Sequence, residues 1–291
     1  MSTERDTGRG TEHDTGDGAV LRAVGLTMAY EQRVVGRDLS VDVPSGEFTA
    51  VIGPNACGKS TLLRMLSRLS RPAAGTVYLD GRDIHRMRAR DLARRLGLLP
   101  QSAITPPGIS VFDLVRRGRY PHQSVLSRWS AEDERSVDRA LAATGMTELA
   151  DRDVDELSGG QRQRAWVAMA LAQESPVLLL DEPTTFLDVS HQLALMELFA
   201  ELHRSGGRTV VAVLHDINHA ARYAGHLVVM SAGRVVAEGP PAQVLTAPLL
   251  SEVFGVDAVI IEDPLHGGPL VVTAYRGRDS ATASPERTAT A

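Results

Sequence analysis

Short apolar segments alternate with amphipathic segments along most of the chain. Buried strands are expected where short apolar runs end at polar or turn residues, as in 47–52, 96–99, 177–180 and 209–214. Helices are expected where apolar residues recur at helical spacing, as in 62–69, 160–173, 190–204 and 216–224. Strands that alternate with helices favour an α/β fold, with a mostly parallel sheet covered by helices on both faces.

Two regions depart from this alternation. Strand-like segments near the N-terminus predict an antiparallel β segment beside the main sheet; they are 20–30, 39–43 and 76–79. Residues 101–157 contain no clear strand but hold helical patterns at 110–118 and 130–144. We therefore expect an inserted helical subdomain at about 101–157.

The ends of the chain differ from its middle. Residues 1–18 and 276–291 are polar and nearly free of large apolar side chains, which predicts disordered tails, and the N-terminus shows no apolar signal region. The main domain is expected over 19–257, followed by a C-terminal β extension at 258–275.

Composition narrows the class of protein. The chain has 291 residues, with 31 basic and 36 acidic side chains and a net charge of −5, so charge gives no support for a nucleic-acid partner. No apolar run approaches the roughly 18 residues that a membrane-spanning helix needs. A single cysteine excludes an intramolecular disulfide and fits a reducing compartment. We expect a protein that is neither secreted nor membrane-spanning.

The segment that follows the apolar run 47–52 carries the first chemical motif. It fits the phosphate-loop pattern G-x-x-x-x-G-K-[ST] and lies between a predicted strand and a predicted helix, as that motif requires. Backbone N–H groups of such a loop bind phosphate oxygens, and the helix N-terminus adds partial positive charge. The nucleotide-binding residues expected here are Gly53, Pro54, Asn55, Ala56, Cys57, Gly58, Lys59, Ser60 and Thr61.

Within this loop Lys59 would contact the β- and γ-phosphates, and the Ser60 hydroxyl would hold Mg²⁺. Lys59 is the only lysine in the chain, since the other 30 basic residues are arginine. A compact ammonium fits inside a phosphate loop better than a planar guanidinium does. For Cys57 we consider two alternatives: a thiol made reactive by the helix N-terminus, or one packed inward and inert.

A second cluster of polar residues follows the apolar run 177–180. Asp181 ends that predicted strand and can hold Mg²⁺ through water, and Glu182 can orient or deprotonate an attacking water. His215 ends the next predicted strand, and by itself a histidine there is more often a surface or packing residue than a γ-phosphate ligand.

The segment Leu157–Gln161 (LSGGQ) opens a predicted helix between these two motifs. Over residues 21–275 the chain resembles the ATPases of ABC transporters. The resemblance implies that Tyr30 stacks on adenine, that Gln101 links Mg²⁺ to a transmembrane partner, and that Asp188 lies in a dimer loop. It also implies that His215 contacts the γ-phosphate and that two copies bind head-to-tail. Each copy would then act on the other copy's ATP through its signature residues, Ser158, Gly159, Gly160 and Gln161.

The family usually has glycine where this chain has Ala56. If that position requires a positive φ, alanine there is strained, although the two glycines that the motif needs, Gly53 and Gly58, are intact.

Several segments are similar to one subfamily, the ATPases of iron–siderophore importers of the ferric enterobactin type; they are 117–122, 184–192, 262–264 and 269–272. This resemblance implies ATP hydrolysis coupled to uptake of a ferric siderophore, with Mg²⁺ as cofactor. The partners it implies are a second ATPase subunit, transmembrane permease subunits and, indirectly, an extracytoplasmic siderophore-binding protein. The subunit would lie peripherally on the cytoplasmic face of the cell membrane.

Two alternatives remain open. Importers of haem and of vitamin B12 share much of this pattern, so the transported ligand is not fixed. A non-transport ABC ATPase that acts on nucleic acid is the more distant alternative. DNA-repair and chromosome-structure ATPases of this kind insert hundreds of coiled-coil residues between the phosphate loop and the signature, whereas here fewer than a hundred separate Thr61 from Leu157. A translation-factor ATPase of this superfamily carries two nucleotide modules, and this chain has one. We therefore expect no nucleic-acid partner.

Overall fold

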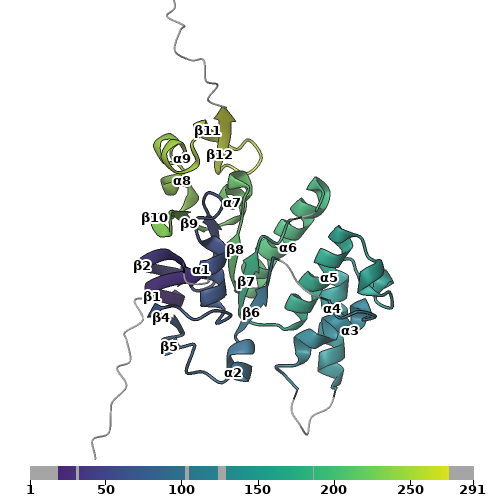
Figure 1. Cartoon of the computed structure of the whole chain (residues 1–291). Coiled ribbons are helices and arrows are strands. Elements are labelled where there is room, and N and C mark those ends of the chain that lie inside the picture. Colours follow the sequence, from purple (N-terminus) through teal and green to yellow (C-terminus); the bar gives the residue numbers. More distant parts are fainter. Residues whose placement is uncertain (1–18, 31–32, 102–104, 124–128, 186, 275–291) are drawn as a thin grey trace, which may run out of the picture.

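The computed structural model describes residues 19–30, 33–101, 105–123, 129–185 and 187–274 (Figure 1). Its main sheet has the strand order β10-β9-β3-β8-β7-β6. These strands are β3 (Phe48–Ile52), β6 (Leu96–Leu99), β7 (Val177–Asp181), β8 (Thr209–Val213), β9 (His226–Ser231) and β10 (Arg234–Gly239). All neighbours pair in parallel except β10, which is antiparallel to β9. The prediction of a mostly parallel sheet is confirmed.

A second, antiparallel sheet has the order β2-β1-β4-β5 and contains the N-terminal strands. Its strands are β1 (Ala19–Tyr30), β2 (Arg33–Pro44), β4 (Ala74–Leu79) and β5 (Arg82–Asp83). This confirms the predicted antiparallel segment, although β2 begins six residues before the expected start at 39. The helix α1 (Lys59–Leu66) packs among these strands, and a short helix α2 (Ala89–Ala93) precedes β6.

The inner strands β3, β7, β8 and β9 are largely buried on both faces, because their alternate side chains enter two different cores. Leu178 and Leu180 of β7 pack with the helices of the insert and of the C-terminal half. Val177 and Leu179 of the same strand pack with α1 and the inward side chains of the antiparallel sheet. This double burial explains why the strands appear in the sequence as continuous apolar runs.

The insert contains only helices and turns among its described residues, apart from one isolated bridge. Its elements are α3 (Val111–Arg116), η1 (Arg117–Arg119), α4 (Ala131–Ala143), η2 (Thr147–Leu149) and η3 (Val154–Glu156). Both α3 and α4 pack against α5 (Gly159–Ala172), and the group lies to one side of the main sheet in Figure 1.

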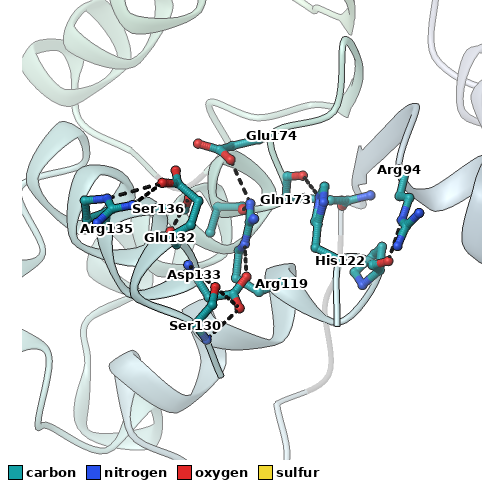
Figure 2. A network of polar contacts seen from close by, with 12 residues as sticks. Arg94, Arg119, His122, Ser130, Glu132, Asp133, Arg135, Ser136, Gln173 and Glu174 are labelled. Atoms are coloured by element: carbon teal, nitrogen blue, oxygen red, sulfur yellow. Dashed lines mark hydrogen bonds and ion pairs between the residues drawn. The ribbon is translucent and has the colours of Figure 1, made fainter. Parts of the chain in front are cut away.

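A buried ion pair fixes the insert to the end of α5 (Figure 2). The Arg119 guanidinium lies 2.9 Å from an Asp133 carboxylate oxygen and 2.8 Å from one of Glu174, and its Nη1 also donates to the Ala172 carbonyl. The adjacent His122 ring contacts the Gln173 carbonyl at 2.7 Å. The turn that follows α3 is therefore tied to the C-terminal end of α5.

The C-terminal third continues with α6 (Val189–Gly206), α7 (Ile217–Tyr223), α8 (Pro241–Val244) and α9 (Ala247–Phe254). It ends in an antiparallel hairpin of β11 (Asp257–Glu262) and β12 (Pro269–Ala274), which agrees with a β extension near 258–275. The sequence analysis predicts no elements over 225–256, where the structure has two strands and two helices. Within the described ranges, no helix is both long and apolar enough to cross a bilayer.

Candidate functional site

The phosphate loop connects β3 to α1 and is shaped by glycines. Gly53 has φ 154°, and a Cβ there would lie 2.2 Å from the Met230 carbonyl oxygen, so no larger residue fits without a backbone shift. Gly58 has φ 109° and caps the N-terminus of α1. These are the two glycines of the motif, and the fold needs both for steric or conformational reasons.

Lys59 begins α1, and its ammonium is enclosed by the loop. Nζ donates to the carbonyls of Gly53 and Pro54, each at 2.9 Å, and the residue is 5% exposed. An ammonium has three N–H donors, so one remains beyond these two carbonyls for a phosphate oxygen. The loop therefore holds the charge at its centre, where a phosphate chain would lie.

The side chain of Ser60, at the start of α1, contacts that of Asp181, at the end of β7. The Ser60 hydroxyl donates to Asp181 Oδ1 at 3.0 Å, although the two residues are 121 positions apart. Burial and the nearby Glu182 charge raise the pKa of Asp181, while the Ser60 hydrogen bond opposes the rise. Hard oxygen donors of this kind suit Mg²⁺. The described residues include no group of three or more His, Cys, Asp or Glu side chains placed to hold a metal, so a cation here would take its remaining ligands from phosphate and water.

Glu182 lies directly after β7 in a left-handed backbone conformation, with φ 51°. His215 Nε2 lies 2.6 Å from its Oε1, and Gln101 Nε2 donates to its Oε2 at 2.7 Å. Gln101 follows β6 and His215 follows β8, and both contact the carboxylate of Glu182, which follows β7. The three residues lie at the carboxyl ends of three parallel strands.

One open pocket of about 580 Å³ lies between the phosphate loop and the side chains of Glu182 and His215. Its lining includes Asn55, Ala56, Gly58, Lys59, Ser60, Thr61, Glu182 and His215, all of which the sequence analysis singled out. It also includes Val34, Val35, Ala232 and Gly233, which the sequence analysis missed. The apolar runs on either side of the Ala232-Gly233 turn could have indicated a hairpin there. Tyr30 ends β1, but its side chain lies outside the described part of the structure.

The signature residues form a different surface. Ser158 caps α5 in a capping box: its hydroxyl accepts from the Gln161 N–H at 3.3 Å, and its N–H donates to Gln161 Oε1 at 3.0 Å. They line a second pocket of about 430 Å³ together with Arg164, Leu187, Asp188 and His191. Among the residues that the structure describes, the two pockets share no lining side chain. The signature therefore lies outside the nucleotide pocket of its own chain.

The structure bears on two expectations about single residues in the loop. Burial raises the pKa of the Cys57 thiol, and the residue is 5% exposed, which favours the inward-packed alternative over the reactive one. Ala56 has φ 61°, so alanine does occupy a position that favours glycine.

Comparison with known proteins agrees with this geometry. Residues 37–185 match the ABC transporter family profile. The ferric enterobactin transport ATP-binding protein FepC of Escherichia coli K12 is 54% identical over 266 residues, which cover 91% of this chain and 98% of that protein.

Two solved structures share the fold. A metal-chelate type ABC transporter in an inward-facing conformation has a TM-score of 0.74 at 29% identity, covering 89% of this chain and 98% of that one. A dimeric bacterial ABC transporter cassette has a TM-score of 0.69 at 27% identity, covering 76% and 98%. By its sequence, its fold and the arrangement of its site, the chain belongs to the ATP-binding subunits of the ABC transporter family, which are ATPases.

Proposed function

We propose that this chain hydrolyses ATP to drive uptake of a ferric siderophore, as a peripheral subunit on the cytoplasmic face of the cell membrane. The observation that carries the proposal is that Lys59, Ser60 and Glu182 line one pocket, with Asp181 hydrogen-bonded to Ser60 beside it. The transported substrate is inferred from the ferric enterobactin relative, because this subunit itself does not contact the siderophore.

In this proposal the loop from Gly53 to Thr61 binds the phosphates of ATP, and Tyr30 stacks on the adenine. The Lys59 ammonium balances charge on the β- and γ-phosphates. Ser60, Asp181 and Gln101 would hold Mg²⁺, which when bound would neutralise charge that develops on the phosphate oxygens.

Glu182 is the general base that orients and deprotonates the attacking water. Its two carboxylate oxygens are each occupied, one by His215 and one by Gln101. Release of the Gln101 amide and of the His215 ring from these oxygens would free the carboxylate for water. Hydrolysis competence therefore depends on a nucleotide in the pocket.

The separate signature pocket supports a homodimer. Ser158, Gly159, Gly160 and Gln161 of each copy would bind the γ-phosphate of ATP held by the other copy, with Asp188 between the two sites. The dimeric form of a similar bacterial cassette supports this arrangement. The dimer would act on transmembrane permease subunits, to which an extracytoplasmic binding protein delivers the siderophore.

Glu182→Gln tests the catalytic assignment, because it preserves shape and removes the base. We expect ATP binding to remain, turnover to fall nearly to zero, and an ATP-dependent dimer to accumulate in sedimentation experiments. Asp216→Asn, an exposed carboxylate that caps the next helix, is the matched control and should keep turnover. Wild-type hydrolysis by Glu182→Gln would remove Glu182 from its role.

The transport assignment needs the permease. A deletion strain that carries the wild-type gene should regain uptake of radioactive iron supplied as a ferric siderophore, and the Glu182→Gln gene should not restore it. Rescue of haem or vitamin B12 uptake instead would keep the ATPase assignment and reassign the substrate.

A further inference from the structure

His191 lies in the signature pocket and has no role in the mechanism above. It is the third residue of α6, 43% exposed at its side chain, and it follows Asp188, the N-cap of that helix. The segment 184–192 that contains both residues was singled out in the sequence for its subfamily pattern.

Three hydrogen bonds converge on a single oxygen of Asp188. Oδ1 accepts from the His191 N–H at 2.9 Å, from the Ser190 hydroxyl at 2.9 Å, and from His191 Nδ1 at 2.8 Å. The first of these is the ordinary N-cap bond. The other two hydrogen bonds come from side chains, and capping of the helix does not require them. They hold a carboxylate that is otherwise largely open to solvent, since the Asp188 side chain is 66% exposed.

The direction of the ring contact can be assigned from chemistry. The backbone N–H and the Ser190 hydroxyl lower the pKa of Asp188 to about 2, so near neutral pH it is an ionised, acceptor-only group. Nδ1 must therefore carry the hydrogen and donate it. The opposite ring nitrogen, Nε2, does not contribute to this contact.

We propose that His191 is a positioning residue, which uses its Nδ1–H to hold the Asp188 carboxylate in the orientation that a second copy of this chain requires. The inference rests on the shared-site dimer of the proposed function. A free surface carboxylate would lose side-chain freedom when the dimer closes, and orienting it beforehand removes that entropic penalty.

The expected loss of dimer affinity follows from the twofold symmetry of the dimer. Immobilising one side chain changes an association constant by about fivefold. A twofold dimer contains the contact twice. Loss of the His191 ring should therefore raise the dissociation constant of the ATP-bound dimer by about 25-fold, while ATP affinity of the single chain stays unchanged.

The test compares His191→Asn, His191→Gln and His191→Ala in the Glu182→Gln background, with dimerisation in Mg·ATP followed by sedimentation. Asparagine keeps an N–H near the position of Nδ1, whereas glutamine can place one only near Nε2. We expect Asn to retain most of the dimer affinity and Gln to weaken it as much as Ala does. In an Asp188→Ala background, His191→Ala should have no further effect.

The proposal would be overturned if Gln retained dimer affinity and Asn did not, or if all three variants lost dimer affinity equally. It would also be overturned if the effects of Asp188→Ala and His191→Ala on dimer affinity were additive. So would unchanged dimer affinity in His191→Ala while the parent dimerises. A parent Glu182→Gln protein that forms no ATP-dependent dimer would instead contradict the shared site itself. Helix content by circular dichroism should be equal in the three variants.

Discussion

At the scale of single residues, three non-glycine residues that line the nucleotide pocket have left-handed backbones. Ala56 has φ 61°, Glu182 has φ 51° and Ala232 has φ 47°. Such conformations cost roughly 1–2 kcal/mol each for residues with a Cβ. At Glu182 the strained backbone accompanies contacts that aim the carboxylate at Gln101 and His215.

Ala56→Gly should therefore stabilise the protein. Relief of the left-handed strain exceeds the entropy that glycine adds to the unfolded chain, which leaves a net gain of about 0.5 kcal/mol. The matched control, Ala142→Gly in α4, should destabilise by about 1 kcal/mol, because that residue lies in a right-handed helix. Urea denaturation measures both. A destabilised Ala56→Gly protein would contradict the strain argument.

Lys59→Arg keeps the charge in a chain that otherwise uses arginine throughout. The Nζ atom lies 2.9 Å from both the Gly53 and Pro54 carbonyls, and this space does not admit a planar guanidinium. We expect kcat/KM to fall at least ~100-fold, or about 2.7 kcal/mol of transition-state stabilisation. Arg204→Lys on the exposed side of α6 is the reverse exchange and should change nothing. Normal hydrolysis by Lys59→Arg would make the single lysine incidental.

At the scale of elements, the helical insert depends on polar contacts as well as on its apolar core. Arg119 is 4% exposed and Asp133 is 5% exposed, and their ion pair is completed by Glu174 and the Ala172 carbonyl (Figure 2). Removing one partner of a buried pair leaves an uncompensated charge, which destabilises far more than the pair stabilises. Because α5 runs from Ser158 to this cluster, the pair also fixes the far end of the signature helix.

Arg119→Met should lower the free energy of unfolding by about 3 kcal/mol. The matched control is Arg135→Met, whose ion pair with Glu132 is exposed and should contribute little. Differential scanning calorimetry compares the two. Equal melting temperatures for the two variants would show that the buried pair contributes no more than the exposed one.

The same substitution should change acid stability. Burial raises the pKa of Asp133, but the hydrogen bonds from Arg119 and Ser130 outweigh it and lower the pKa below its usual 3.8. The stabilisation is therefore present above pH 3.8 and is lost as pH falls through the lowered folded-state value. Without Arg119 the buried carboxylate protonates more easily, so acid unfolding of Arg119→Met should begin at higher pH.

At the scale of the whole molecule, the decisive feature is the separation of the phosphate-loop pocket from the signature pocket. The phosphate loop and Glu182 line one pocket, while Ser158 and Asp188 line another. A chain that closes the signature on its own nucleotide would need these surfaces to face each other within one copy. Their separation favours a site that two copies complete.

Ser158→Arg tests this separation. We expect the single chain to bind ATP with nearly wild-type affinity, because the substitution lies outside its nucleotide pocket. Dimer closure and hydrolysis should be lost, since a bulky side chain replaces the N-cap at the shared contact. Lys59→Ala is the control that removes nucleotide binding by the single chain. If Ser158→Arg weakens ATP binding as much as Lys59→Ala does, the site is not shared.

Much of the fold and the chemical motifs could be predicted because their determinants are local. The phosphate loop is contiguous, and its glycines, Lys59 and Ser60 are fixed by adjacency to β3 and α1. The strands β3, β7 and β8 were visible in the sequence as mostly apolar runs because they are buried on both faces. The elements at 226–254 were missed, since short strands and helices near turns carry weak periodicity.

The sequence by itself determined which groups are available: one lysine in a phosphate loop, a carboxylate pair after a buried strand, and a capping serine before a helix. Tertiary structure decided which of them meet. Gln101 and His215 both contact Glu182 because β6, β7 and β8 are adjacent and parallel, which brings their carboxyl ends together. Burial of the Cys57 thiol and the closeness of Val35 to Gly233 were also decided by packing, because both depend on residues distant in the chain.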